Sequence, residues 1–230
     1  MAATLPETPF VLAGPVGRQS WPAQRAATIP RLAGVRALLV PVKSFRTAKL
    51  RLAPVLNAGE RAALARSLAA GVLGAAGGLD RHVVCDDEEV ADWARSQGAR
   101  VIWTPGLGLS GAVQAGVATL AGEGVTLVVV AHGDLPNAGP LDALGSEDQV
   151  TLVPDFQSDG TNVAVVPASA GFCFSYGPGS FERHRAEAAR LGLECEVIHD
   201  ARLAADVDVP ADLAHVASAK LAVIRAAAVP

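Results

Sequence analysis

The segment that decides the fold is residues 125–136, which read VTLVVVAHGDLP. Residues 125–131 form an apolar run of strand length, typical of a parallel strand that is buried on both faces. The run ends abruptly, and Asp134 follows shortly after it. Open α/β sheets bind ligands beyond the carboxyl ends of such strands. The stretch therefore predicts a ligand site around Asp134.

From residue 36 onward the chain alternates strand-length apolar runs with alanine-rich stretches of helical period. This alternation predicts a parallel sheet with helices on both faces. A turn over residues 155–160, between two strands, would make the later part of the sheet mixed. The expected strands cover residues 36–42, 81–85, 99–103, 125–131, 149–154, 161–167 and 194–198. The expected helices cover residues 58–76, 87–97, 110–122, 180–191 and 210–219, with Asn57 and Ser110 as start signals for two of them.

These elements predict an α/β fold of three layers, with a mixed, mostly parallel sheet between helices. At 230 residues, half of them apolar, the chain is long enough for one domain with a good core. We expect a single domain over residues 35–230. Residues 1–34 contain scattered prolines and arginines and are expected to form a flexible N-terminal extension.

The overall charge and the cysteines narrow the class of protein. A formal net charge of −4 gives no indication of a nucleic-acid groove or of binding to an anionic membrane surface. No apolar stretch approaches the roughly 20 residues of a membrane helix. The three cysteines, Cys85, Cys173 and Cys195, are far apart and form no metal or redox motif. We expect a cytoplasmic protein that acts on small molecules.

Aspartates stand at two separated positions that suit a metal. Asp134 follows the buried strand, and Asp208 lies in a second motif, with Asp206 as an alternative ligand two residues before it. One or two such carboxylates hold Mg²⁺ beside substrate phosphates. Each aspartate could instead cap a short helix, because a proline follows two residues later. Their joint occurrence favours the metal, and we interpret Asp134 and Asp208 as its ligands.

Cations gather just beyond the first expected strand. Lysine offers a flexible point charge and arginine a planar fork to phosphate oxygens. A solvated basic loop is the alternative, but the place after the first strand of a nucleotide-binding sheet favours a triphosphate site. The cations in question are Lys43, Arg46, Lys49 and Arg51.

Two glycine-rich segments add candidate contacts. Residues 106–111, GLGLSG, have the glycine spacing of a dinucleotide motif without a good acidic partner, and no P-loop is present. We interpret Gly108 and Ser110 there as nucleotide contacts, with a simple tight turn as the alternative. Residues 159–162 and 176–184 could bind a second phosphate through backbone N–H groups and hydroxyls. The alternatives are a hairpin turn for the first segment and Ser180 as an ordinary helix N-cap for the second.

Taken together, these motifs resemble the guanylyltransferases of coenzyme F420 biosynthesis, which attach GMP to phosphoenolpyruvate or 2-phospho-L-lactate. The resemblance covers about residues 36–220. Two positions depart from the family pattern, because Ser110 stands where asparagine is frequent and Gly133 replaces a usual alanine. The matching segments are residues 40–43, 48–52, 85–90, 133–136, 159–162, 176–184 and 206–210.

The resemblance implies a nucleotide-diphospho-sugar transferase fold and a role for each candidate. Lys43, Lys49 and Asp134 would be catalytic, and Asp134 and Asp208 would hold Mg²⁺. The nucleotide-binding residues would be Lys43, Lys49, Arg51, Asp87, Gly108 and Ser110. The residues that receive the phosphorylated acceptor would be Thr161, Asn162, Gly177, Gly179 and Ser180.

The expected reaction is transfer of GMP from GTP to the phosphate of phosphoenolpyruvate, with release of pyrophosphate. The same chemistry on 2-phospho-L-lactate or 3-phospho-D-glycerate stays open, because the sequence does not show which side chains line the carbon skeleton. A nucleotide-binding domain without turnover is the alternative from another class. The partners expected are GTP and a phosphorylated three-carbon acid, with possible hand-over of the product to the next enzyme of the pathway.

Overall fold

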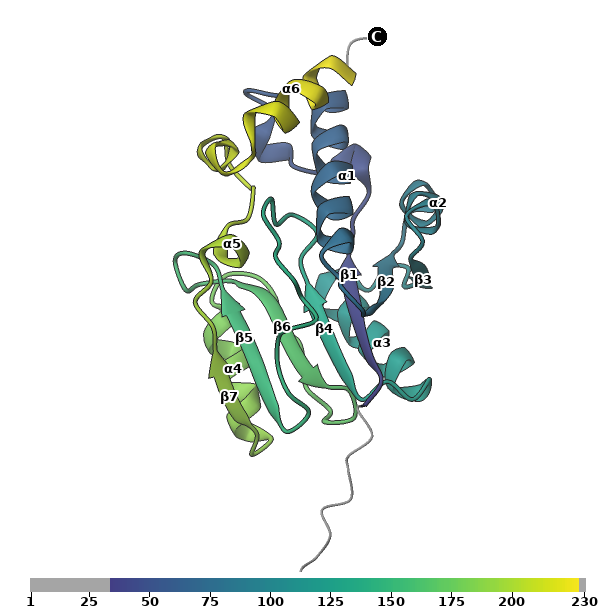
Figure 1. Cartoon of the computed structure of the whole chain (residues 1–230), viewed down its shortest axis with the longest axis vertical. Coiled ribbons are helices and arrows are strands. Elements are labelled where there is room, and N and C mark those ends of the chain that lie inside the picture. Colours follow the sequence, from purple (N-terminus) through teal and green to yellow (C-terminus); the bar gives the residue numbers. More distant parts are fainter. Residues whose placement is uncertain (1–33, 228–230) are drawn as a thin grey trace, which may run out of the picture. The chain divides into compact units, whose positions relative to one another are not determined.

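The structure, a computed structural model, describes residues 34–227, which form a central sheet with helices around it (Figure 1). The sheet has seven strands in the order β3-β2-β1-β4-β6-β5-β7. The predicted extension over residues 1–34 lies outside the described residues except for Gly34. The strands are β1 (Arg36–Pro41), β2 (Asp80–Cys85), β3 (Arg100–Trp103), β4 (Leu127–Ala131), β5 (Gln149–Pro154), β6 (Thr161–Pro167) and β7 (Glu194–Val197).

The sheet is mixed and mostly parallel, as predicted. β1 pairs in parallel with both β2 and β4, and β5 pairs in parallel with β7. β6 is antiparallel to its neighbours β4 and β5. All strands except β6 run in the same direction. The carboxyl ends of β1, β2 and β4 and the amino end of β6 therefore meet at one edge of the sheet. Lys43 and Asp134 follow the carboxyl ends of β1 and β4, Asp87 follows that of β2, and Thr161 begins β6.

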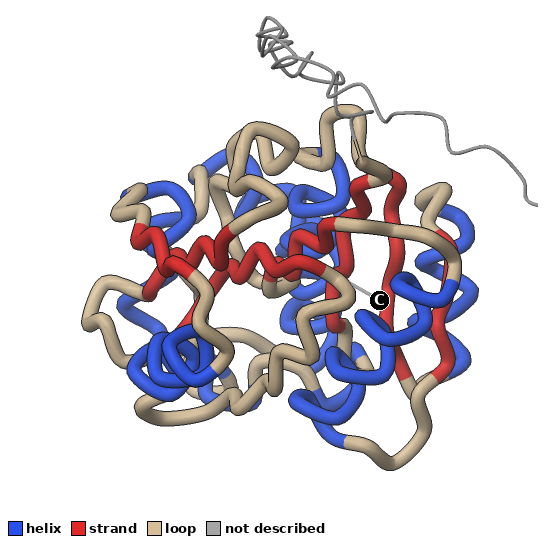
Figure 2. The backbone as a smooth tube through the Cα atoms, turned by 90° about the horizontal axis from the view of Figure 1, so that it is seen from below, coloured by secondary structure: helices blue, strands red, loops and turns tan. Residues whose placement is uncertain are grey.

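Helices cover both faces of the sheet, and Figure 2 shows them on either side of the strands. The α-helices are α1 (Ala58–Gly74), α2 (Glu88–Ser96), α3 (Gly108–Gly122), α4 (Ser180–Arg190), α5 (Ala201–Ala204) and α6 (Ser218–Ala227). Residues of α1, α2 and α5 pack into the core on one face, and residues of α3 and α4 into the core on the other. Within residues 34–227, no helix is both long enough and apolar enough to cross a bilayer.

The two cores follow from the alternation of side chains along each strand. In β1, Leu38 and Val40 belong to the core under α1, whereas Ala37 and Leu39 belong to the core under α3. All residues of β4 are buried. A strand with both faces covered needs apolar side chains at every position, which explains the uninterrupted apolar run at residues 127–131.

One predicted helix is wrong. Residues 210–219 do not form a continuous helix: Pro210–His215 is a 3₁₀ helix, and α6 begins only at Ser218. The chain is extended at Val216, with φ −90° and ψ 126°. Leu213, Val216 and Ile224 instead pack in a third apolar cluster between this segment and α1, so tertiary packing outweighs local helical pattern here.

Of the two predicted helix starts, the structure confirms one and not the other, and it adds short elements that were not predicted. Asn57 caps α1 in a complete capping box with Glu60. Ser110 is not a start signal, because α3 begins two residues earlier, at Gly108. The sequence analysis missed α5 and two 3₁₀ helices, Phe45–Thr47 and Leu50–Leu52. These two 3₁₀ helices shape the cation-rich segment after β1.

Packing of α3 on the sheet leads to a stability prediction. A Cβ at Gly116 would lie 2.7 Å from a Val84 methyl carbon and 2.8 Å from a Leu39 methyl carbon, whereas a Cβ at Gly122 would meet nothing within 4 Å. We expect Gly116→Ala to lower the free energy of unfolding by about 1–3 kcal/mol. Gly122→Ala, the control, should raise it by about 0.4–1 kcal/mol. Urea unfolding of both variants tests this, and equal stabilisation by both would contradict it.

Candidate active site

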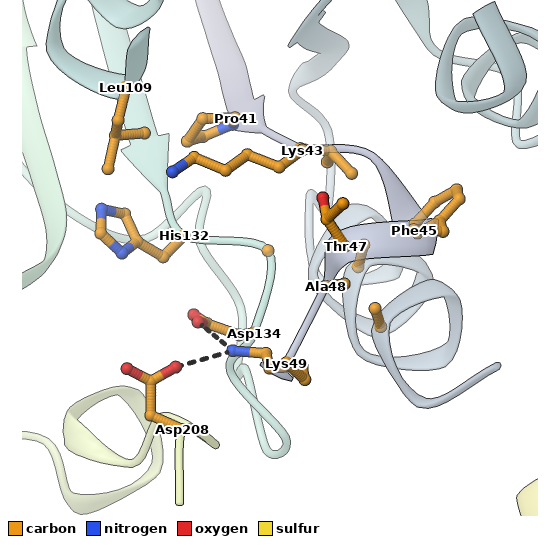
Figure 3. A pocket seen from close by; sticks show the side chains of 14 residues that line it. Pro41, Lys43, Phe45, Thr47, Ala48, Lys49, Leu109, His132, Asp134 and Asp208 are labelled. Carbon is orange, nitrogen blue, oxygen red and sulfur yellow. Dashed lines mark hydrogen bonds and ion pairs between the residues drawn. The ribbon is translucent and has the colours of Figure 1, made fainter. Parts of the chain in front are cut away.

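Three adjoining pockets lie along the carboxyl edge of the sheet. The central pocket, about 330 Å³, lies beyond β1 and β4 (Figure 3). The acidic pocket, about 470 Å³, lies beside β6 and the start of α4. The β2 pocket, about 290 Å³, lies at the ends of β1 and β2. Lys43 and Leu109 line both the β2 and central pockets, and Asp134 and Asp208 line both the central and acidic pockets. The three pockets therefore form one row.

An acidic triad lies where the central and acidic pockets meet. Asp134, Asp206 and Asp208 each bring one carboxylate oxygen within 4.8 Å of the others. Lys49 Nζ lies 2.6 Å from Asp134 Oδ2 and 3.1 Å from Asp208 Oδ1. The second oxygen of Asp134 is buried and has no hydrogen-bond partner within residues 34–227. The structure thus brings the two predicted metal ligands together and adds Asp206 to them.

The charges of this group are strongly coupled. Burial alone would lower the pKa of Lys49, but the neighbouring Asp134 and Asp208 carboxylates raise it above its usual value. Burial would likewise raise the pKa of Asp134, but Lys49 lowers it. Asp206 differs, because burial and repulsion from Asp134 and Asp208 raise its pKa to about 6. One ammonium therefore compensates two carboxylates and leaves the third without a matching cation.

Local backbone conformation places the members of this group. Lys49 stands between the two 3₁₀ helices in the left-handed region, with φ 53° and ψ 40°, which turns its side chain toward Asp134. The carboxylate of Asp212 accepts hydrogen bonds from the amides of Asp208 and Val209. This fixes the backbone at Asp208. Asp134 follows β4 without any helix after it, so the capping alternative for Asp134 is wrong.

Two predicted acceptor residues with hydroxyl groups, Thr161 and Ser180, line the acidic pocket. The Ser180 hydroxyl oxygen accepts from the Thr161 amide at 3.1 Å. The Nε2 of His184 accepts from the Ser175 amide, so its Nδ1 carries the proton and donates to the Thr161 hydroxyl oxygen at 3.0 Å. Burial lowers the pKa of His184 to about 4, which keeps the ring neutral. Within residues 34–227 neither hydroxyl donates a hydrogen bond, so both protons can donate to an anion.

The other predicted acceptor residues have more varied roles. Gly177 lines the acidic pocket, and within the described chain its amide has no acceptor. Asn162 also lines it but uses its amide to hold the carbonyls of Leu203 and Ala204 in α5. Gly179, not Ser180, is the N-cap of α4, with φ 71°, and its amide donates to Asp159. The interpretation of Ser180 as an ordinary N-cap is therefore wrong.

The predicted nucleotide residues are spread over the row of pockets. Lys43 and Gly108 line the β2 pocket, and Lys49 lines the central pocket. Arg51 lines the acidic pocket, 3.4 Å from Asp208. Asp87 and Ser110 line none of the three pockets. Asp87 caps α2, and the Ser110 hydroxyl accepts from the amide of Tyr176.

Sequence reasoning assigned no role to two aromatic residues at the site. His132 follows β4 directly and lines both the central and acidic pockets, and Tyr176 lines the acidic pocket. Their ring centroids are 4.9 Å apart. Burial lowers the pKa of His132, so its ring is neutral at physiological pH. The position of His132 at the end of the deciding strand was a usable signal, whereas nothing in the sequence pairs it with Tyr176.

Residues 36–218 match the family described as "Guanylyl transferase CofC like". The chain belongs to this family. It is 36% identical over 188 residues to the phosphoenolpyruvate guanylyltransferase of Sphaerobacter thermophilus, which covers 78% of this chain and 91% of the relative. It is 35% identical over 193 residues to the 3-phospho-D-glycerate guanylyltransferase of Phenylobacterium zucineum, a match that covers 78% of this chain and 88% of the relative. It is 30% identical over 188 residues to the 2-phospho-L-lactate guanylyltransferase of Methanothermobacter thermautotrophicus, a match that covers 77% of this chain and 82% of the relative.

Solved structures confirm the fold class. A protein from Desulfovibrio desulfuricans, described as a nucleotide-diphospho-sugar transferase, superposes with a TM-score of 0.65 at 17% identity. The match covers 84% of this chain and 96% of that one. The predicted three-layer fold of this type is thus confirmed, and family membership identifies the chain as a nucleotidyltransferase, specifically a guanylyltransferase.

Proposed function

We propose that this chain transfers GMP from GTP to the phosphate of phosphoenolpyruvate and releases pyrophosphate. The observation that carries the proposal is the row of three pockets with the acidic triad at a junction between two of them. Such a row gives room for a nucleoside, its phosphates and an acceptor in sequence. The same site would serve 3-phospho-D-glycerate or 2-phospho-L-lactate, the acceptors in the names of two relatives.

The acidic triad fits a divalent cation. Mg²⁺ prefers hard oxygen ligands, and the triad offers three carboxylates, including the buried, unpartnered oxygen of Asp134. We assign Asp134 and Asp208 as ligands, with Asp206 beside them. Bound there, Mg²⁺ would supply positive charge to phosphate oxygens during transfer. Burial and, after it, repulsion from Asp134 and Asp208 raise the pKa of Asp206. A cation would relieve the repulsion, which supports this assignment.

Transfer needs no protein base. A phosphate monoester with a second pKa near 6 is largely dianionic at neutral pH, so its oxygen can attack the α-phosphorus directly. A new bond forms between this oxygen and the α-phosphorus, and the bond to the β-phosphate oxygen breaks, with the electron pair leaving on pyrophosphate. Lys43 and Lys49 in the central pocket would stabilise the charge on the phosphates.

The acceptor would be held in the acidic pocket. The free hydroxyl protons of Thr161 and Ser180, together with the Gly177 amide, provide neutral donors for an anion there. We propose that they receive the phosphorylated acid, in line with the sequence resemblance. Arg51 also lines this pocket, where it would add a cation near the acceptor.

The resemblance further supports a place in coenzyme F420 biosynthesis, in the cytoplasm, with hand-over of the product to the next enzyme. We propose that residues 35–230 act as a single domain in this role.

The acceptor is tested by measuring pyrophosphate release with GTP and Mg²⁺. Phosphoenolpyruvate, 2-phospho-L-lactate and 3-phospho-D-glycerate are supplied separately, with ATP and CTP in place of GTP as controls. We expect the highest kcat/KM with phosphoenolpyruvate and GTP. A higher value with another acceptor would reassign the substrate, and GTP binding without release in every case would indicate a binding domain.

The raised pKa of Asp206 predicts an unusual pH dependence of stability without metal. Its carboxyl binds a proton more tightly in the folded chain, with a pKa of about 6 against the ordinary 3.8. The folded state thus gains stability below pH 4 and loses it as pH rises through 6. In EDTA at pH 7.5 we expect Asp206→Asn to be more stable than the wild type by about 1–2 kcal/mol, allowing for partial exposure. At pH 4 the difference should vanish.

Urea unfolding at both pH values measures this effect, with Asp92→Asn, an exposed carboxylate paired with Arg95, as the control. A variant that is less stable than the wild type in EDTA at pH 7.5 would show that Asp206 is compensated within the chain.

A further inference from the structure

Three of the side chains that face the central pocket also face the acidic pocket: His132, Asp134 and Asp208. If the proposed function holds, the α-phosphorus of GTP and the attacking phosphate oxygen meet where these two pockets join. Two of the three shared side chains are carboxylates, which accept hydrogen bonds and repel phosphate. His132 is the member of this shared set that can donate a hydrogen bond without carrying a full charge.

His132 is held firmly in this position. Its amide donates to the Asn162 carbonyl at 3.0 Å, which ties the residue to β6. Its ring packs against Tyr176, whose own amide is held by the Ser110 hydroxyl. In Figure 3 the ring lies in the pocket wall between the end of Lys43 and the group formed by Asp134, Lys49 and Asp208. A donor fixed in this way needs little reorganisation during reaction.

The Nε2 atom of His132 is buried and has no hydrogen-bond partner within residues 34–227. Leaving such an atom unpaired costs about 1–3 kcal/mol. His82 shows that this alone does not identify a site: its Nε2 is also buried and unpaired, but its ring lies on β2 and lines none of the three pockets. What distinguishes His132 is that its side chain lines both the central and the acidic pocket while its Nε2 has no partner in the described chain.

We propose that His132 is a catalytic residue that donates a hydrogen bond from Nε2–H to a non-bridging oxygen of the α-phosphate. The ring keeps its proton throughout. The bond between the acceptor oxygen and the α-phosphorus forms, and the bond to pyrophosphate breaks, as in the proposed function on which this inference rests. The donor stabilises the extra negative charge on the α-phosphate oxygens as the acceptor attacks, so it acts mainly on kcat.

Three variants test this role by steady-state kinetics. His132→Leu removes the donor, and we expect kcat to fall about 10²-fold, with both KM values within about threefold of the wild type. His132→Gln places an amide N–H near the position of Nε2 and should restore kcat to within about tenfold of the wild type. His82→Leu, a matched loss of a buried histidine with an unpaired Nε2, should leave kcat unchanged.

Two kinetic results would overturn the proposal. If His132→Leu kept the wild-type kcat, the donor would be dispensable. If His132→Leu and His132→Gln lost equal activity, His132 would act by packing, since the amide would then bring no recovery.

A second readout does not depend on turnover. NMR signals of the histidine ring nitrogens, with His132 assigned through its loss in His132→Gln, are recorded with Mg²⁺ and an α,β-methylene analogue of GTP. We expect the Nε2 signal of His132 to shift while that of His82 does not. Binding of the analogue, seen by calorimetry, without a His132 shift would contradict the inference. A shift in a protein that is inactive with every acceptor would refute the proposed function and the catalytic role of His132 with it, and would leave only a contact between His132 and the α-phosphate.

Discussion

Asp134→Asn is expected to lower kcat with GTP and acceptor by about 10³-fold or more. The change removes one charge from a carboxylate that contacts Lys49 at 2.6 Å and whose second oxygen is buried without a partner. The asparagine amide is nearly the same size, so packing around the site should hold. What is lost is a hard oxygen ligand for the cation and the negative charge that orients Lys49.

The measurement is pyrophosphate release as a function of Mg²⁺ concentration, with circular dichroism to show that the variant is folded. Asp92→Asn, on the exposed surface of α2, serves as the control and should retain full activity. An Asp134→Asn variant with unchanged turnover and unchanged Mg²⁺ dependence would refute the metal assignment.

Lys49→Met should have the next largest effect, a fall in kcat of about 10²- to 10³-fold. Methionine keeps the length and the apolar stem of the side chain but removes the ammonium that lies among Asp134 and Asp208. Without it, the carboxylates of the triad face one another with less compensation, and the phosphates lose a cation in the central pocket. The variant should therefore also be less stable in EDTA than in Mg²⁺.

Lys220→Met on α6 is the matched control, because Lys220 lies outside the row of three pockets. Turnover and thermal unfolding are measured for both variants. Full activity in Lys49→Met would mean that Lys49 only balances charge in the metal-free chain and takes no part in phosphate binding.

The fold was predictable because hydrophobic periodicity dominates this chain. The apolar run within residues 125–131 is typical of a strand with both faces covered, and β4 (Leu127–Ala131) is such a strand. The turn at residues 155–160 likewise predicted the antiparallel placement of β6. The exception is residues 210–219, where Pro210 starts a helical turn that Val216 interrupts by packing into an apolar cluster. Local pattern does not contain that tertiary contact.

Within the candidate site, the sequence predicted single residues at strand ends but not the side-chain contacts between them. The triad of Asp134, Asp206 and Asp208 follows from strand order, because both motifs fall at the same edge of the sheet. The left-handed turn at Lys49 and the 3₁₀ helix after it bring Arg51 to the acidic pocket, and its nucleotide contact stays a prediction. The pairing of His184 with Thr161 depends on side-chain geometry that spacing does not reveal.

The most direct test of the central claim follows the phosphorus atoms of GTP. The protein is incubated with Mg²⁺, phosphoenolpyruvate and GTP that carries a radiolabel on either the α- or the γ-phosphate, and the products are separated by charge. The account predicts that the α-label enters a new compound containing the acceptor, while the γ-label leaves as pyrophosphate. A γ-label on the acceptor, or an α-label that stays in GTP or appears as GDP, would contradict GMP transfer at this site.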